Sequence, residues 1–430
     1  MHFKELEFTS QPALDWVAPY AAKAAHALES LSFPTKKDED WRFTPLKTLS
    51  KHAFQSVNGE AKSVTEEHVQ KYRLPESKES TLVLVNGVIR EDLSTFSLST
   101  EAITVKKLQD MTPSELDEAG FQSLVPVERD YFSVLHTATL TSGYYLHVHK
   151  GAKVEAPIHL LNIQTGSATP YVSSFRLLIH VEQEAEATLI EEHVSLDDSV
   201  YLTIPVMETF VQKKGRLNHL RIQRENKSCF HVSRPITSLE GTAEYHSYTI
   251  SLGAHLFRNE PQIIQTGEEV DFTLDGLILI DGDQISDTHS VMDHRFSHGN
   301  SHQLHKVVVH GNAHSVFNGK IFVRQDAQII DSFQENRNLL LSRDGIVYTK
   351  PQLEIFADDV QCSHGATIGD LDPDEVFYLQ SRGMTEQKAK EVLTYAFALE
   401  TIENIEVESV HTFLVDEVKA YTSRNVASRF

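Results

Sequence analysis

The chain has 430 residues, of which 40% are hydrophobic, and this length exceeds what a single hydrophobic core usually serves. Its 61 acidic residues outnumber 39 basic residues, and the net charge of −22 repels nucleic-acid phosphates and anionic lipid surfaces. The two cysteines, Cys229 and Cys362, offer no disulfide framework, which fits a reducing compartment. No window approaches the roughly 20 apolar residues of a membrane-spanning helix. We therefore expect a soluble, cytoplasmic protein that binds neither nucleic acid nor membranes.

The first third of the chain is mixed in character. An alanine-rich stretch from Pro12 to Leu31 predicts a helix that Pro19 interrupts or kinks. Phe33 to Leu49 mixes aromatic, charged and turn-forming residues, which predicts a packed connector anchored by Trp41. In Thr81 to Arg90, alternating residues surround an Asn-Gly pair, and this predicts a hairpin with a two-residue type I′ turn.

The middle of the chain, from about Tyr131 to Val360, is dominated by strand patterns. Short apolar or alternating runs follow one another, and none sustains helical periodicity. These runs are Tyr144 to His149, Ile158 to Ile163, Phe175 to Val181, Thr188 to His193, Val206 to Gln212, Phe272 to Ile280, Lys306 to His310 and Gly319 to Val323. The absence of crossover helices excludes a doubly wound α/β sheet. The pattern leaves open whether the strands form a large sandwich or a solenoid of stacked coils.

After Gly369 the sequence predicts helices. Asp372 is typical of an N-cap, while Arg382 and Gly383 are typical of a helix end. A second helix is expected from about Thr385, and a third from Val410 to Tyr421. The second carries an apolar stripe that we expect to be buried, formed by Ala389, Val392, Leu393, Ala396 and Phe397. Because the exposed residues carry mixed charge, a packing or partner-docking hairpin is favoured over a DNA-reading helix-turn-helix.

Cys362 and His364 are the most informative pair of residues. They lie two positions apart at the end of an apolar run, so an extended backbone projects both side chains to one face. A thiolate and an imidazole are soft metal ligands, but a structural zinc site needs four ligands and a catalytic one needs three. The pair is therefore either structural or half of a site that is completed elsewhere.

A histidine-rich segment offers a second candidate for metal binding. Seven of the 23 histidines fall between His289 and His314, namely His289, His294, His298, His302, His305, His310 and His314. Glycine and serine residues within the segment argue for loop and strand. The histidines His294, His298 and His302, which are spaced four residues apart, should therefore not align on one helix face. A self-contained metal-binding enzyme that uses this segment is the alternative function.

Other catalytic chemistries find little support in the sequence. Cys362 with His364 as base lacks an identifiable orienting group, and the adjacent Asp358 and Asp359 should point to opposite faces of a strand. Cys229 is expected to be a small packed side chain. No phosphate loop, dinucleotide fingerprint or separated carboxylate pair of a carbohydrate-active solenoid is found. No catalytic residue is therefore assigned.

A series of motifs occurs in order along the chain, at Glu39 to Leu46, Val85 to Gly87, His314 to Gly319, Ala327 to Asp331, Gln334 to Ser342, Pro351 to Gly369 and Phe377 to Gly383. Together these motifs resemble the SufB/SufD family of the SUF iron-sulfur cluster assembly machinery. The chain is most similar to the SufD branch, because SufB proteins are usually longer and richer in cysteine. The resemblance covers nearly the whole chain, although the middle third matches in character more than in motif.

The resemblance implies a mainly β fold, a right-handed parallel β-helix or β-solenoid flanked by an N-terminal α/β region and C-terminal helices. The corresponding domains are residues 1–125, a β-helix core at 126–365, and a C-terminal helical domain at 366–430.

The resemblance also implies a noncatalytic scaffold within a complex. The expected partners are a SufB-like paralogue and two copies of a SufC-like ABC ATPase, with a homodimer when the chain is expressed alone. The ATPase would dock between Leu371 and Ala398, on Phe377, Tyr378, Arg382 and Gly383. His364, with Cys362 beside it, would help to hold a transient iron-sulfur cluster at the paralogue interface, and the scaffold would aid iron acquisition. The sequence leaves open the electron source, for which a reduced flavin is one candidate.

Overall fold

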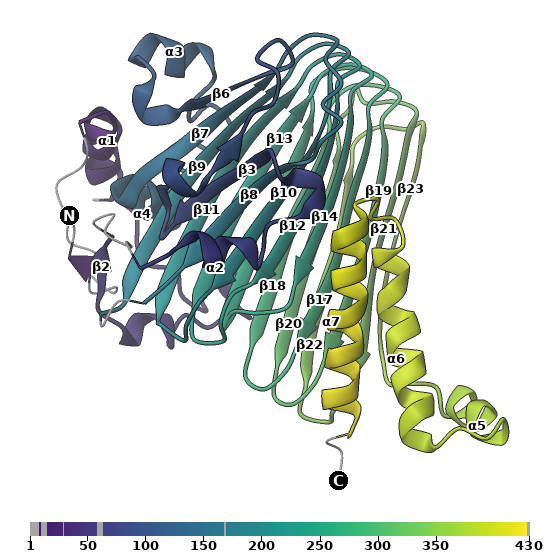
Figure 1. Ribbon diagram of the computed structural model, residues 1–430. Coiled ribbons are helices and arrows are strands. Elements are labelled where there is room, and N and C mark those ends of the chain that lie inside the picture. Colours follow the sequence, from purple (N-terminus) through teal and green to yellow (C-terminus); the bar gives the residue numbers. More distant parts are fainter. Residues whose placement is uncertain (1–7, 10–14, 29, 58–62, 167–168, 428–430) are drawn as a thin grey trace.

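The computed structural model describes residues 8–9, 15–28, 30–57, 63–166 and 169–427. Its centre is a β-solenoid of about eight turns, from residue 140 to residue 369 (Figure 1). This result settles the choice that the strand pattern leaves open, and it confirms the mainly β fold that the resemblance implies. None of the helices in the described ranges has the length and apolar character needed to cross a membrane.

Two parallel sheets form the solenoid, because successive strands alternate between them. The first sheet contains β7 (Leu140–Val148), β9 (Tyr171–Val181), β11 (Tyr201–Val211), β13 (Phe230–Leu239), β15 (Leu256–Asn259), β16 (Gln262–Gln265), β18 (Ile285–His294), β20 (His314–Val323) and β22 (Ile346–Ile355). The second contains β8 (Ile158–Gln164), β10 (Glu186–Ser195), β12 (Arg216–Arg224), β14 (Glu244–Ser251), β17 (Asp271–Ile280), β19 (Asn300–Val309), β21 (Ile330–Leu340) and β23 (Val360–Gly369). Side chains from both sheets fill the space between them, and residues of the N-terminal region pack on the outer faces of β9 and β11, so these two strands are buried on both faces.

One corner of the solenoid repeats the same backbone conformation. In successive coils a residue adopts a positive φ angle, and these residues are Gly151, Glu184, Lys214, Thr242, Glu269, His298 and Ile329. Each backbone N–H donates to a carbonyl of the next coil, as from Glu184 to Lys213 (3.1 Å) and from His298 to Gln328 (3.0 Å). The corner therefore extends the hydrogen bonding of the sheets around the bend.

The N-terminal region closes one end of the solenoid. Its strands are β1 (Phe8–Thr9), β2 (Phe54–Ser56), β3 (Ser80–Val85), β4 (Val88–Ile89), β5 (Thr95–Phe96) and β6 (Ile103–Lys107). Its helices are α1 (Ala18–Leu28), α2 (Glu66–Gln70), α3 (Pro113–Glu118) and α4 (Tyr131–Thr139), with short 3-10 turns at Glu39–Trp41, Leu49–Lys51, Pro75–Ser77, Glu91–Leu93 and Leu108–Asp110. Strands β2 and β3 pair in parallel with β9 and β8 and thereby extend both sheets.

Two of the N-terminal predictions are confirmed and one needs correction. The hairpin joins β3 to β4 through Asn86 and Gly87, whose φ angles of 52° and 79° suit a type I′ turn. Trp41 is buried and stacks on Phe132, as expected of an anchor. Pro19 does not kink a helix, because α1 begins at Ala18 and proline is tolerated in a first turn. Residues 10–14, where the helix was expected to start, lie outside the described residues.

Three helices follow the last strand: α5 (Pro373–Ser381), α6 (Glu386–Ile402) and α7 (Glu408–Ala427). Helices α6 and α7 lie side by side against the second sheet (Figure 1). The predicted stripe on α6 is partly wrong, since Ala396 is exposed. The buried side chains are Ala389, Thr394, Ala398, Thr401 and Ile402. The helix packs between a sheet and a neighbouring helix, and this environment accepts threonines that a search for apolar residues overlooks.

Candidate functional site

Both sheets of the solenoid end in an unpaired strand at the same end of the molecule. Strand β22 is the last of the first sheet, β23 is the last of the second, and each is ten residues long. Within the described part of the chain, no further strand covers either edge. Pro351 fits the edge position of β22, because proline lacks the backbone N–H that an inner strand donates. The solenoid therefore ends with free hydrogen-bonding edges.

Cys362 and His364 lie on β23 at this open end. The strand pairs with β21 so that Cys362 is next to Ser332 and His364 is next to Gln334. Ser332 and Gln334 are buried in the solenoid interior, and in-register parallel neighbours face the same side. Both ligand-type side chains therefore belong to the interior face, where no further coil covers them. Cys362 is half-buried against the core, and His364 is exposed.

The pair is chemically incomplete. Burial raises the pKa of the Cys362 thiol, and the nearby Asp331 carboxylate adds to this shift. His364 has no side-chain hydrogen bond or ion pair to any described residue. The side-chain oxygen of the adjacent Gln334 is buried and also lacks a partner among these residues. No third metal-ligating side chain gathers with the pair in the described ranges.

Apolar side chains surround the open end. Strands β21, β22 and β23 and their connecting loops expose Ile329, Phe333, Ile346, Tyr348, Ile355, Phe356 and Ile368. Phe356 is 60% exposed and Ile368 is 48% exposed. A cluster of this kind at a free sheet edge is typical of a surface that another chain covers.

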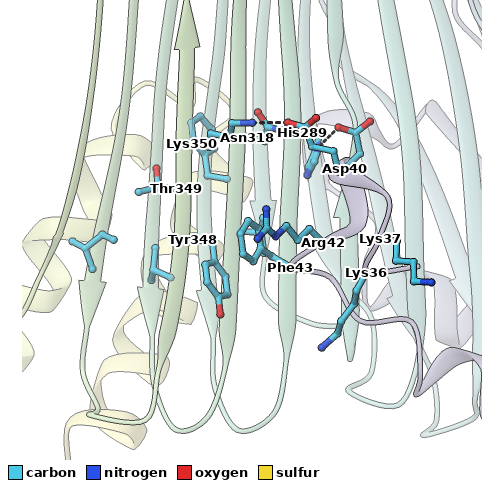
Figure 2. A pocket seen from close by; sticks show the side chains of 15 residues that line it. Lys36, Lys37, Asp40, Arg42, Phe43, His289, Asn318, Tyr348, Thr349 and Lys350 are labelled. Atoms are coloured by element: carbon cyan, nitrogen blue, oxygen red, sulfur yellow. Dashed lines mark hydrogen bonds and ion pairs between the residues drawn. The ribbon is translucent and has the colours of Figure 1, made fainter. Parts of the chain in front are cut away.

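A cavity of about 830 Å³ lies beside the open end, between the connector (residues 33–49) and strands β20 and β22 (Figure 2). In its lining, Lys350 Nζ lies 2.8 Å from Glu39 Oε1 and a nitrogen of His289 lies 4.0 Å from Asp40, while Lys36, Lys37 and Arg42 add positive charge. Phe43 stacks on Tyr348 with ring centroids 4.1 Å apart. The lining reaches β23 at Ile368 but includes neither Cys362 nor His364. The cavity is thus separate from the ligand pair.

The connector is held to the solenoid by a buried network that motif reasoning did not identify. The hydroxyl of Thr44 donates to the buried Asp287 carboxylate, which also pairs with Arg258 and with His289 (3.0 Å). The Arg258 guanidinium lies 3.8 Å from the centre of the Trp41 ring and donates to the backbone carbonyl of Asp40 (2.8 Å). The contacts between the connector and the solenoid join residues more than 200 positions apart. The only local sequence signal for them is that Trp41 and Thr44 both lie within the motif at Glu39 to Leu46.

Helix α5 projects away from the solenoid at the same end (Figure 1). Asp372 caps it by accepting from the N–H of Asp374, and Gly383 ends it with a φ of 94°, as the sequence predicts. Phe377 and Tyr378 are 69% and 57% exposed, and the Arg382 guanidinium lies over the Tyr378 ring at 5.3 Å. The helix therefore presents two largely exposed aromatic side chains.

The histidine-rich segment forms strands and turns, and its histidines are dispersed. His294 is buried and bonded to Gln265 and Ser301, His305 is buried against Phe317, and His302 stacks on Phe333 near Asp275. His298 occupies the corner conformation with positive φ. The structure describes the whole segment, and no three ligands in it approach one another closely enough to hold a metal ion. The expectation that three histidines would not share a helix face is confirmed.

Cys229 is fully buried, as the sequence predicts. Burial raises the pKa of its thiol, and the Glu225 carboxylate contributes to the shift. The side chain packs with Tyr171, Tyr201 and Phe257. An inert structural role follows, because a buried protonated thiol is a poor nucleophile.

Comparison with known proteins places the fold and this end of the molecule in context. A family model described as "SUF system FeS cluster assembly, SufBD core domain" matches residues 163–397, and one for the SufBD N-terminal region matches residues 4–160. An iron-sulfur cluster assembly SufBD family protein of Synechocystis is 34% identical, covering 90% of this chain and 87% of the relative. The Escherichia coli iron-sulfur cluster assembly protein SufD is 32% identical over 91% of this chain and 90% of its own length. The chloroplastic protein ABCI7 of Arabidopsis thaliana is 31% identical over 88% of this chain and 81% of its own length. The chain belongs to the SufBD family of the SUF iron-sulfur cluster assembly system.

Proposed function

We propose that this chain is a noncatalytic scaffold subunit of a SUF complex, and that a transient iron-sulfur cluster assembles at its open end. The observation that carries the proposal is the position of His364 and Cys362 on the interior face of an uncovered edge strand. Thiolate and imidazole are ligands of iron-sulfur clusters. Two ligands cannot hold a cluster alone, so a partner supplies the others, and incomplete ligation suits a site that releases its product.

The partner at the open end is a SufB-like paralogue. Strands β22 and β23 are each ten residues long and each have one unpaired edge, and two incoming strands, one on each edge, can satisfy these backbone groups and extend both sheets. The exposed apolar rim, including Ile355, Phe356 and Ile368, would be buried by the same contact. A related solenoid brings a matching pair of edges, which favours a paralogue over an unrelated protein.

A SufC-like ABC ATPase docks on α5. Aromatic side chains are over-represented among the residues that dominate binding energy, and Phe377 and Tyr378, on one turn of α5, are both largely exposed. The helix stands apart from the solenoid, so a partner can surround it (Figure 1). Movement of the ATPase on nucleotide binding would reach the open end through the short link between β23 and α5.

The test of the cluster site is His364→Ala in the purified complex. Cluster formation, followed by visible absorption after supply of iron and sulfide, should fall in yield and rate, with subunit composition unchanged. Ser363→Ala is the matched control, because Ser363 is on the same strand but faces the opposite side. Unchanged yield and rate with His364→Ala would exclude the proposed role of His364.

Co-purification tests the scaffold role itself. A longer paralogue and an ABC ATPase should be recovered with the wild-type chain. Combined replacement of Phe377 and Tyr378 by alanine should release the ATPase and retain the paralogue, whereas alanine at the exposed Gln387 of α6 should release neither. Recovery of the chain without either partner would contradict the function while leaving the fold unaffected.

A further inference from the structure

Two histidines and a glutamate gather on the outer surface of the solenoid, near its N-terminal end. His147 lies near the end of β7, His149 follows that strand, and Glu182 follows β9, the parallel neighbour of β7 (Figure 1). Leu146 and Val148 point into the core, so His147 faces outward. The cluster is far along the chain from Cys362 and His364 and shares no residue with the proposed scaffold site.

The three side chains converge on one point. Their ligand atoms all lie within 4.8 Å of one another. His147 Nε2 lies 3.0 Å from Glu182 Oε1, and the two imidazole rings have centroids 4.7 Å apart. All three residues are partly exposed, so an ion can enter and can keep water molecules in its remaining positions.

Neighbouring groups hold the three side chains in place. Thr104 Oγ1 lies 2.8 Å from His149 Nε2, and the backbone N–H of Lys150 donates to Glu182 Oε2 at 2.6 Å. Burial raises the pKa of Glu182, but the hydrogen bonds from Lys150 and His147 outweigh it and lower the pKa below its ordinary value. Metal-binding histidines usually donate their other ring N–H to an oxygen acceptor, and the Thr104 hydroxyl oxygen is in position to accept from His149.

We propose that His147, His149 and Glu182 form a site for a divalent first-row transition metal ion. Two imidazoles and one carboxylate with open positions suit ferrous iron, and imidazole with carboxylate also binds zinc. The nearby His180 does not belong to the group of ligand atoms that lie within 4.8 Å of one another, and its Nε2 donates to the carbonyl of Ala119 at 2.9 Å. The site belongs to this chain alone and does not depend on the proposed partners.

A second cluster of the same composition lies inside the solenoid and is a different kind of feature. His193, Glu225 and His231 are fully buried. His193 Nε2 pairs with Glu191 at 2.8 Å, and the Glu225 carboxylate is bonded to His231 Nδ1 at 2.6 Å and to Gln223 and Thr203. Most of their polar atoms therefore already have partners, and solvent has no direct access.

The experiment measures metal binding by the full-length chain, without an affinity tag and after removal of metal with a chelator. Titration with Zn²⁺ by calorimetry, and with Fe²⁺ under anaerobic conditions, should show one ion per chain on the outer site. Glu182→Gln and His149→Ala should each weaken binding by at least about tenfold. Thr104→Val should weaken it by about 10- to 100-fold, as other outer-contact changes do. Circular dichroism and thermal unfolding confirm that each variant is folded.

The matched control is His246→Ala. His246 is also on the outside of a sheet, 3.8 Å from Glu244 and 3.3 Å from Thr273, but among the described residues it belongs to no group of three metal-ligating side chains. This variant should bind as the wild type does. Binding of one ion that is unaffected by combined His149→Ala and Glu182→Gln would overturn the proposal and point to the internal cluster. Absence of binding by the wild-type chain would overturn it as well.

Discussion

Glu208 illustrates how single residues hold this solenoid together. It is fully buried on β11, and its carboxylate accepts from Arg176 Nε at 2.8 Å and from the backbone N–H groups of Leu124 and Val125 at 2.8 and 2.9 Å. A buried carboxylate is tolerated only when charge and hydrogen bonds compensate it. This one fastens the segment before α4 to the first coils.

Replacing Glu208 with alanine should therefore be strongly destabilising. The change leaves the buried Arg176 guanidinium and several N–H groups without their acceptor, and breaking a buried pair in this way costs about 3–5 kcal/mol. Denaturant unfolding measures the loss in the free energy of unfolding. Glu184→Ala is the control, because Glu184 is half exposed and its contact with Lys214 is 3.7 Å long, so its loss should cost at most about 1 kcal/mol. Equal losses in the two variants would contradict this account.

The reactivity of Cys362 gives a second prediction for a single residue. Burial and the Asp331 carboxylate both raise the pKa of its thiol. Alkylation should therefore reach its half-maximal rate at a pH above the ordinary pKa of a cysteine thiol, about 8.5. Asp331→Asn removes a charge that favours the neutral thiol, so it should lower this pKa and speed alkylation at a fixed pH.

Mass spectrometry after iodoacetamide treatment measures the rate. Cys229 is fully buried, so the Cys362→Ser variant should show almost no labelling while folded. An unchanged pH profile in Asp331→Asn would show that the carboxylate does not act on the thiol.

Secondary structure was more predictable from the sequence than the way the elements combine. The strands, the type I′ hairpin and the capped C-terminal helices follow from local patterns, and all are present. The repeat escaped detection because its corner positions are occupied by Glu184, Lys214, Thr242 and His298 as well as by glycine. Interactions with the next coil hold these residues at positive φ, so no single residue type marks the corner.

The connector gives a prediction for one element. Trp41 stacks on Phe132, and the Arg258 guanidinium lies over the Trp41 ring. Trp41→Ala therefore removes both contacts and opens a cavity. Large-to-small changes of this kind cost about 3–5 kcal/mol. We expect faster limited proteolysis within residues 33–49 and a lower free energy of unfolding. Lys47→Ala is the control, because Lys47 is an exposed residue of the same connector and its loss should leave the connector protected. If the connector of the Trp41→Ala variant resists proteolysis as well as that of the wild type, the connector is anchored by other residues.

The candidate site depends on the whole molecule. Spacing alone identified Cys362 and His364 as a same-face pair, and register with β21 places them together on the interior side. The spacing of the two residues does not show that β23 is the last strand of its sheet. That position depends on the number of coils before β23, and on the fact that no further coil follows it in the described part of the chain. The motifs around the pair pointed to a partner, and the uncovered edges give a physical reason for one.

The last prediction concerns self-association of the isolated chain. Two unpaired strands with an apolar rim are a template for pairing, so at high concentration we expect dimers that join through their open ends. Lysine at both Ile355 and Ile368 places charges on this rim and should shift the chain to monomer in sedimentation velocity, since charge on an edge opposes strand pairing. Phe296→Lys is the matched control, because Phe296 is 43% exposed in the turn between β18 and β19, away from the edge strands, and should leave the dimer intact. A dimer that persists in the double-lysine variant would mean that another surface mediates association, and a strictly monomeric wild-type chain would mean that the open ends of two copies do not pair.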